Sequence, residues 1–341
     1  MGVQCRSRCI ATVLGLLLAC VPATQAAPSP IFYFPGMMVS NLTASISAAG
    51  ACTQARRNVQ LWPPQVSELL AGRDCWYQSI RLDFEGGRFV NGTGAEVWAE
   101  PFTTLASVPA SLQTWVAEIQ NRFPIYKYGV NLFIMAYDWR LDVNSMAQTG
   151  QLQQLAQAIL DKTDSSNRAI LIGHSQGALV ATQLLQLPDV GELASLIPPE
   201  LLDGVKLPFP GADALVREVT WNAVKGMASL AMLLPYNAAY ENGIDALVVR
   251  AGSDAYIVSR MPILLRDLGD RQLVNTFDQT HTLDKLVASG PIPGVDVYCM
   301  YGIDISTVKQ LVYNVTLSNS IAPLPWGYLY ARGDSVVTFT A

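Results

Sequence analysis

A serine stands in a short glycine-flanked motif that is typical of enzymes that cleave acyl esters. The motif Gly-His-Ser-Gln-Gly at 173–177 follows an apolar run at 169–172 and precedes a helix-like run at 178–185. A tight strand-to-helix turn of this kind presents the serine hydroxyl above a sheet, and the glycines let strand and helix approach each other. The pattern predicts Ser175 as a nucleophile that forms an acyl-serine intermediate. A glycine-serine turn without chemistry is the alternative.

Such a nucleophile also needs backbone N–H groups that bind the oxyanion of the tetrahedral intermediate. In the fold that carries this turn, one donor is the residue after the nucleophile, here Gln176, and another comes from an early loop. Met37 is the second candidate, because Pro35-Gly36 ends the first apolar run and glycine permits a tight turn there. An ordinary core methionine is the alternative for Met37.

The acid and the base of a catalytic triad are harder to assign. Asp334 follows an apolar run at 328–331 and is the preferred acid, with Asp304 as its competitor; either could instead cap a helix or occupy a turn. The triad order in this fold is serine, acid, histidine, and no histidine follows Asp334. Of the two histidines, we expect His174 to point its side chain away from the nucleophile and His281 to be a surface residue of a cap; a catalytic base at His281, against the usual chain order, is the alternative.

Alternating strands and helices surround these residues. Uninterrupted apolar runs suit strands buried on both faces of a sheet, and apolar residues three or four apart suit helices that cover it. This order predicts an α/β-hydrolase fold with a mostly parallel, doubly wound sheet, in one domain from 27 to 341 with a cap inserted at 198–293. The expected strands are 31–34, 131–136, 169–172, 295–301 and 328–331, and the expected helices are 111–123, 146–160, 178–185 and, in the cap, 223–234.

The first 26 residues have the pattern of a cleavable signal peptide. Arg6 and Arg8 precede an apolar run at 10–19, and small residues at 24–26 offer a cleavage site. The run is too short to span a bilayer, so we expect a secreted protein, with lysosomal or vacuolar delivery left open. A bacterial lipoprotein anchored at Cys20 is the alternative.

Export has consequences for cysteines and asparagines. Beyond the leader, Cys52 and Cys75 can close a short loop, which leaves Cys299 without a partner. In a eukaryote, Asn-X-Thr triplets would make glycan acceptors of Asn41, Asn91 and Asn314.

Composition argues against several classes of protein. The net charge is -5 with a pI near 5.1, and no run of Lys or Arg is present, so a nucleic-acid partner is not expected. Neither a metal nor a nucleotide cofactor is expected, because the sequence has no P-loop and no cluster of His and Cys ligands.

Taken in order, these segments resemble the lecithin:cholesterol acyltransferase family, which includes the lysosomal phospholipase and transacylase branch. The most distinctive match outside the nucleophile turn is Ala-Tyr-Asp-Trp-Arg at 136–140, whose Asp138 and Arg140 are expected to form a structural ion pair rather than to bind substrate. The other matching segments are Phe34-Pro35-Gly36 with Asn41-Leu42, Cys52 with Cys75-Trp76, Leu61-Trp62, 233–237, 293–302 and Gly333-Asp334.

The resemblance implies a reaction and the residues that perform it. By it, Ser175 is the nucleophile, Asp334 the acid, and the amides of Met37 and Gln176 the oxyanion hole. Members of the family take an acyl chain from a phospholipid and pass it to an alcohol or to water. The expected partners are therefore a phospholipid or lipoprotein surface and a sterol or other alcohol.

The chain departs from the family pattern near its end. The family's histidine, and the cysteine that pairs with the Cys299 position, both lie beyond the acid, whereas this sequence ends at Ala341. We expect a missing C-terminal segment, through truncation, an incomplete gene model or real loss. Two other functions stay open: a catalytically inactive lipid-binding remnant, and a general secreted lipase or esterase.

The resemblance also implies that a disulfide ties the two ends of a lid or membrane-binding loop at 52–75. Within it, Leu61 and Trp62, with Leu69 and Leu70, are candidates for an apolar face that enters a lipid surface, since Trp favours the boundary between water and hydrocarbon. A small core beneath the loop is the alternative.

Overall fold

The computed structural model describes residues 27–187 with short gaps and separate stretches of the remainder. The described residues are 27–86, 88–163, 167–187, 190, 194–196, 227–234, 247–269, 274–275, 277–278, 305–314, 316–317 and 327–333. Several sequence predictions lie outside them: the leader 1–26, the strand 295–301, and the residues His281, Cys299, Asp304 and Asp334.

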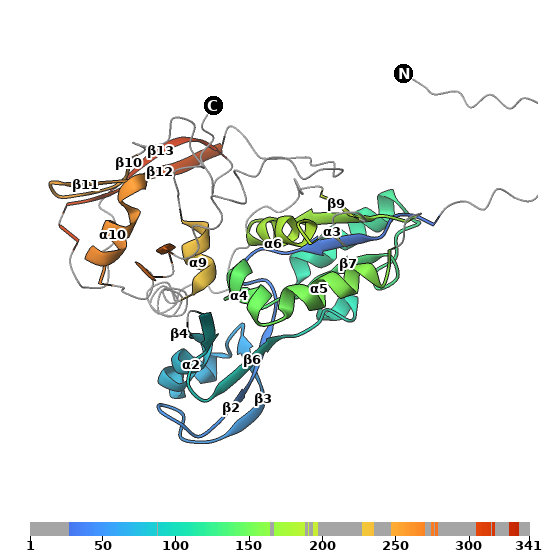
Figure 1. Ribbon diagram of the computed structural model, residues 1–341, viewed down its shortest axis with the longest axis horizontal. Coiled ribbons are helices and arrows are strands. Elements are labelled where there is room, and N and C mark those ends of the chain that lie inside the picture. The colour runs from blue at the N-terminus through green and yellow to red at the C-terminus, as the bar shows by residue number, and fades with distance from the viewer. Residues whose placement is uncertain are drawn as a thin grey trace, which may run out of the picture.

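A parallel sheet lies at the centre of the fold, as the sequence predicted (Figure 1). Its strand order within the described residues is β7 (Leu132–Ile134), β1 (Ile31–Phe34), β8 (Ala169–Gly173) and β9 (Ala194–Leu196), with every neighbouring pair parallel. In register, Ile31 pairs with Leu132 on one side and with Ile170 on the other. The helices packed on it are α3 (Ala110–Arg122), α4 (Val143–Gln148), α5 (Gln151–Leu160) and α6 (Gln176–Leu185).

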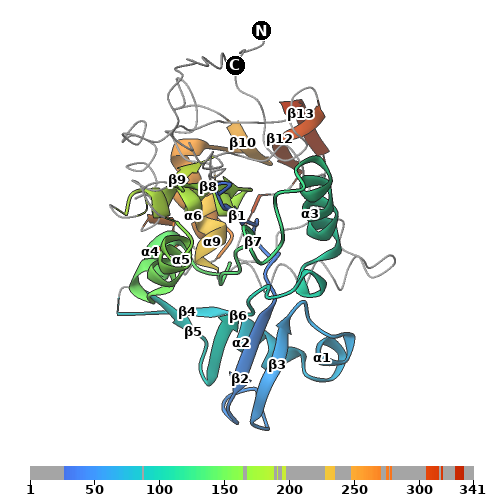
Figure 2. The ribbon, with the colours of Figure 1, turned by 90° about the vertical axis from the view of Figure 1, so that its right-hand side faces the viewer.

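Both faces of this sheet are buried because successive side chains of a strand point to opposite faces. Ile31 and Tyr33 of β1 pack in the hydrophobic cluster that contains the buried residues of α3. Phe32 and Phe34 pack in the cluster that contains those of α5 and α6. Figure 2 shows α3 on one side of the sheet and α5 and α6 on the other. The uninterrupted apolar runs of the sequence thus correspond to strands that are buried on both faces of the sheet.

The single helix predicted at 146–160 is wrong in one respect, because the structure has two helices there. α4 ends at Gln148 and α5 begins at Gln151. Gly150, between them, has a φ of 78°, the left-handed conformation in which glycine commonly ends a helix. The apolar spacing continues across this break, so the pattern alone predicted one element.

α4 begins at a buried carboxylate, and this gives a prediction on pH. The side chain of Asp142 accepts a hydrogen bond from the amide of Ser145 at 2.6 Å. Burial raises the pKa of Asp142, against hydrogen bonds from Ser145 and Asn144 that lower it. Because the folded pKa lies above the unfolded one, the carboxyl stabilises the fold most at low pH, and this stabilisation is lost as pH rises through the folded pKa.

Asp142→Asn keeps the cap and removes the desolvated charge. We expect its free energy of unfolding at pH 7 to exceed that of the parent by on the order of 1 kcal/mol, with the difference shrinking towards pH 4. Urea denaturation across this range measures it. Asp142→Ala, which loses the cap as well as the charge, should be less stable than Asp142→Asn at every pH by about 1 kcal/mol. An Asn variant whose difference from the parent grows as pH falls would contradict the prediction.

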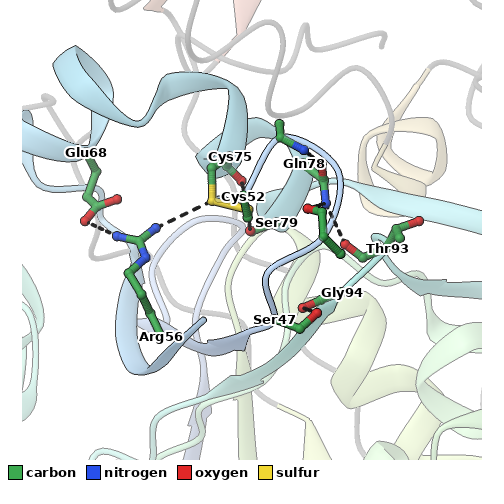
Figure 3. Close-up of a disulfide and its surroundings, with 11 residues drawn as sticks. Ser47, Cys52, Arg56, Glu68, Cys75, Gln78, Ser79, Thr93 and Gly94 are labelled. Carbon is green, nitrogen blue, oxygen red and sulfur yellow. Dashed lines mark hydrogen bonds and ion pairs between the residues drawn. A yellow bond between two sulfur atoms is a disulfide. The ribbon is translucent and has the colours of Figure 1, made fainter. Parts of the chain in front are cut away.

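The disulfide-tied part of the chain forms a separate layer at one end of the molecule (Figure 1). Cys52 and Cys75 form a disulfide with an S–S distance of 2.10 Å, and Arg56 donates to Cys75 Sγ and to Glu68 beside it (Figure 3). The elements here are an antiparallel sheet of β3 (Arg56–Trp62), β2 (Leu42–Ile46) and β6 (Ala95–Ala99), the helices α1 (Val66–Ala71) and α2 (Arg73–Ile80), and a hairpin of β4 (Leu82–Glu85) and β5 (Arg88–Asn91).

A second sheet lies at the other end, and it corrects the expectation for 328–331. Those residues form a strand, but it is antiparallel to its neighbour in this second sheet and does not join the central parallel one. Tyr328, Leu329 and Tyr330 are all exposed, and because successive side chains of a strand point to opposite faces, this strand has exposed side chains on both faces. The strand order of this sheet is β11 (Asp254–Ile257), β10 (Leu247–Ala251), β12 (Ile305–Tyr313) and β13 (Gly327–Gly333).

Two α-helices of the predicted cap lie among the described residues. They are α9 (Ala228–Leu233), inside the predicted 223–234, and α10 (Met261–Asp267).

Candidate active site

The turn between β8 and α6 has the geometry that a serine nucleophile requires. Ser175 has φ 53° and ψ -125°, a conformation that is strained for any residue with a side chain, and its side chain is exposed. Gln176 follows as the first residue of α6, so its amide is one of the N–H groups that have no partner within a helix. The backbone therefore presents a hydroxyl and a free helix terminus at the same point.

The glycines that flank this serine are required by close backbone contacts. A Cβ on Gly177 would lie 2.1 Å from the carbonyl oxygen of Phe34, and one on Gly173 would lie 2.4 Å from Cα of Ala178. Neither neighbour can rotate away, because both are main-chain atoms. The spacing of the motif thus lets α6 approach β1 and β8.

Gly177→Ala should lower the free energy of unfolding by about 1–3 kcal/mol, because the methyl group overlaps two carbonyl groups of the strand β1 and its continuation. Gly327→Ala is the matched control, since a Cβ there meets nothing within 4 Å. We expect the control to change stability by less than about 0.5 kcal/mol. Chemical denaturation of both variants decides; equal midpoints would disprove the close contact.

The turn after β1 lies against the nucleophile turn. A Cβ on Gly36 would lie 3.2 Å from Cβ of Ser175 and 3.0 Å from Nδ1 of His174, and the His174 amide donates to the Phe34 carbonyl at 3.0 Å. Met37, the next residue, is half-buried. The structure thus brings Ser175, Gln176 and the segment that begins at Met37 to one place, although they lie far apart in the sequence.

The side chain of Gln176 faces inward and ties the site to the segment at 136–140. It is fully buried, and its Nε2 donates to the carbonyl groups of Trp139 and Leu141 at 3.0 and 3.1 Å. Sequence reasoning assigned only the amide of Gln176 and missed this side chain. Its position in the motif gave no signal of the contact, because the acceptors are main-chain groups about 35 residues away.

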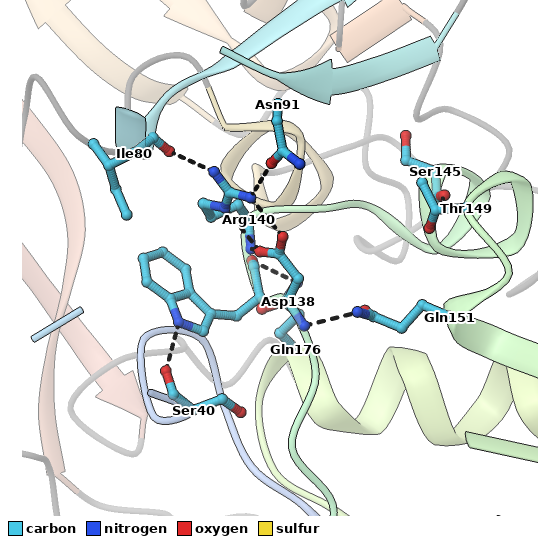
Figure 4. A network of polar contacts seen from close by, with 10 residues as sticks. Ser40, Ile80, Asn91, Asp138, Arg140, Ser145, Thr149, Gln151 and Gln176 are labelled. Carbon is cyan, nitrogen blue, oxygen red and sulfur yellow. Dashed lines mark hydrogen bonds and ion pairs between the residues drawn. The ribbon is translucent and has the colours of Figure 1, made fainter. Parts of the chain in front are cut away.

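The predicted ion pair between Asp138 and Arg140 is confirmed and fully enclosed (Figure 4). The guanidinium donates from Nε and Nη2 to the two carboxylate oxygens at 2.9 and 2.6 Å, and the exposed fractions of the residues are 0% for Arg140 and 4% for Asp138. It also donates to the Ile80 carbonyl at 3.0 Å and to Asn91 Oδ1 at 2.6 Å. The pair therefore joins the segment before α4 to the disulfide-tied layer.

The cap reaches the same place through α9. The amide of Ser229 donates to the carbonyl of Arg140 at 3.1 Å, and its hydroxyl lies 3.6 Å from the sulfur of Met37. Ser229 is fully buried. Nothing in its sequence surroundings pointed to this position, so the cap contact is a finding of the tertiary structure.

The expectation that Leu61 and Trp62 form an exposed apolar face is not met in this structure. Their exposed fractions are 1% and 7%, and both belong to the main hydrophobic cluster. They are core residues, as in the alternative, but they belong to the main core and not to a small core beneath the loop. The exposed large apolar residues of the loop are Val66 and Leu70 on α1, at 56% and 72%. Leu61 and Trp62 are the last two residues of β3 and the only buried ones in that strand.

The candidate glycan acceptors differ in their surroundings. Asn91 and Asn41 are half-buried, and Asn91 is already a hydrogen-bond acceptor for Arg140. Asn314 is exposed directly after β12. Glycosylation at the three sites stays a prediction.

A cavity of about 330 Å³ lies beside β7. It borders Phe102, Phe133 and Gln154, but neither Ser175 nor Met37. Within the described part of the chain, no group of three or more His, Cys, Asp or Glu residues could hold a metal ion, and no helix is both long and apolar enough to cross a bilayer.

The fold and the turn define the class: a mixed α/β protein with a parallel sheet and a strand-turn-helix of the nucleophile-elbow type. Residues 61–189 match the family model of lecithin:cholesterol acyltransferase. With the relatives below, this match confirms the resemblance to the lecithin:cholesterol acyltransferase family that the motifs showed.

Relatives align with most of this chain but differ in length. A protein of Arabidopsis thaliana, provisionally named phospholipid:diacylglycerol acyltransferase 2, is 28% identical over 303 residues, which are 85% of this chain and 42% of the relative. The phosphatidylcholine-sterol acyltransferase of Gerbilliscus gambianus is 25% identical over 278 residues, 79% of this chain and 84% of the relative. That of Rattus norvegicus is 23% identical over 343 residues, 90% and 74%. The chain thus spans less than half the length of the first relative.

Proposed function

We propose that this chain is a phospholipid acyl-ester hydrolase and O-acyltransferase that works through an acyl-serine intermediate at Ser175. The single observation that carries the proposal is the exposed serine held at φ 53° between β8 and α6, against Gly36. The names of the relatives describe acyl transfer with phosphatidylcholine and a sterol, or with a phospholipid and diacylglycerol. The substrate class of the proposal follows from these names.

The proposed reaction has two steps. Ser175 Oγ attacks the ester carbonyl carbon and gives its proton to a general base, while the amides of Met37 and Gln176 bind the oxyanion. The ester C–O bond then breaks, and the lysophospholipid leaves with the proton. In the second step an alcohol or water attacks the acyl-serine, which restores the serine hydroxyl. Asp334 is proposed as the acid that orients the base, and no described residue is assigned as the base.

Contact with a lipid surface is assigned in this proposal to α1. Val66 and Leu70 are one turn apart and both exposed, so they present one apolar face. The Cys52–Cys75 disulfide suits an oxidising compartment, which is where the proposed leader would deliver the chain. A phospholipid surface as partner is consistent with that location. Export and lipid contact are therefore parts of the same proposal.

Phosphatidylcholine vesicles with a labelled acyl chain test the proposal, with and without a sterol or long-chain alcohol. We expect lysophospholipid together with free fatty acid, and a new ester when the alcohol is present. A fluorophosphonate should add covalently to Ser175, as read by mass spectrometry of the peptide. Vesicle binding without any product or label would replace the proposal with a lipid-binding protein. Turnover of soluble short-chain esters alone would replace it with a general esterase.

A further inference from the structure

The turn that carries Met37 is strained. Met38 has a φ of 69°, in the left-handed region that residues with side chains rarely adopt. A conformation of this kind persists only where surrounding contacts hold it. The amide proposed for the oxyanion hole is therefore positioned by whatever holds Met38.

Two indole groups hold this turn. The Nε1 of Trp62 donates to the carbonyl of Met38 at 2.7 Å, and the Nε1 of Trp139 donates to the carbonyl of Ser40 at 2.9 Å, the latter bond being visible in Figure 4. The two rings pack edge to face, with centroids 5.4 Å apart and an interplanar angle of 70°. Each indole thus fixes one carbonyl of the turn and the position of the other ring.

The same pair is connected to the nucleophile. The carbonyl of Trp139 accepts a hydrogen bond from Nε2 of Gln176, whose own amide is the other proposed oxyanion donor. Trp139 therefore contacts both parts of the proposed oxyanion hole. It binds the side chain of Gln176 directly, and it packs against Trp62, which holds the turn that carries the Met37 amide. A shift of Trp62 would move the Met37 amide relative to Ser175.

Trp62 also belongs to the disulfide-tied layer. It is the last residue of β3, and the preceding carbonyl, that of Leu61, accepts from Nε1 of Trp76 at 2.8 Å. Trp76 follows Cys75 of the disulfide in α2. A continuous set of contacts therefore runs from the disulfide through β3 to the turn at 37–40.

We propose that Trp62 is a positioning residue that holds the oxyanion turn through the Met38 carbonyl and couples the disulfide-tied layer to Ser175. This inference rests on the proposed function for its catalytic consequence. Trp62 acts through Met38 and does not touch substrate. Loss of its N–H frees the strained turn, and a displacement of the donor by about 1 Å reduces the rate by about 100-fold.

Trp62→Phe tests the inference because it removes the N–H and keeps a ring. We expect kcat on phosphatidylcholine to fall about 10- to 100-fold with KM unchanged, and amides 37–40 to exchange hydrogen at least about 10-fold faster. Trp98→Phe is the matched control: its indole donates to Glu100 at 2.7 Å outside the turn, and neither readout should move. Adding Met38→Gly to Trp62→Phe should restore much of kcat, since glycine adopts the left-handed conformation without strain.

The outcomes separate the two proposals. A raised KM with unchanged kcat, or unchanged exchange at 37–40, would overturn the positioning role. If the parent protein itself shows no turnover, the proposed function fails, while exchange in Trp62→Phe against Trp98→Phe still decides whether the clamp exists. If Trp62→Phe does not fold, hydrogen exchange of the parent protein provides the measurement, and amides 37–40 that exchange as fast as those of an exposed loop overturn the inference.

Discussion

Ser175→Ala should lower the rate of acyl release from phosphatidylcholine by at least about 10⁴-fold, because no other group replaces the attacking oxygen. Fluorophosphonate labelling at this peptide should disappear, while binding to the vesicles remains as in the parent. Ser47→Ala is a matched control, since Ser47 is likewise exposed but lies in the disulfide-tied layer. If Ser175→Ala turns over phosphatidylcholine as fast as Ser47→Ala does, the acyl-serine mechanism at Ser175 is rejected.

The same position offers a second readout that needs no substrate. Ser175→Gly removes the side chain that makes φ 53° unfavourable, so it should raise the free energy of unfolding by about 1 kcal/mol while abolishing turnover. Ser175→Ala keeps the strain and should leave stability within about 0.5 kcal/mol of the parent. Urea denaturation distinguishes the two. A destabilised glycine variant would show that the turn is not strained.

Arg140→Met should lower the free energy of unfolding by about 3–5 kcal/mol, because it leaves the carboxylate of Asp138 buried without its partner. It also removes the donors to Ile80 and Asn91, so the disulfide-tied layer loses its polar attachment to this segment. The double variant Asp138→Leu with Arg140→Met should recover part of this loss, since no charge then remains buried.

A surface ion pair supplies the control for this prediction. Arg122 and Glu118 are 2.6 Å apart on α3, with side chains 69% and 43% exposed. Arg122→Met should change stability by less than about 0.5 kcal/mol. Calorimetry or urea denaturation of Arg140→Met and Arg122→Met compares them directly. Similar losses would mean that burial does not decide the strength of the Asp138–Arg140 pair.

The sequence by itself determined the features that a few neighbouring residues encode. The turn at 173–177 requires glycine at 173 and 177, where main-chain atoms of other segments lie too close for a Cβ, and it holds Ser175 between them at φ 53°. Both features are encoded within five neighbouring residues. The apolar runs 31–34 and 169–172 predicted buried strands, because a strand buried on both faces has no polar alternation. The segment 136–140 indicated the family and its ion pair.

Only the tertiary structure decided the features that depend on contacts between distant segments. Trp62 was a candidate for a lipid surface, with a small core as the alternative; it is buried and donates a hydrogen bond to Met38, 24 residues before it. The strand at 328–331 lies in a second, mixed sheet, and Ser229 meets Met37 from the cap. An apolar residue or strand is equally suited to a core, a membrane face or either kind of sheet. Which location such a segment takes depends on packing against residues far away in the sequence, and a local sequence pattern does not specify those residues.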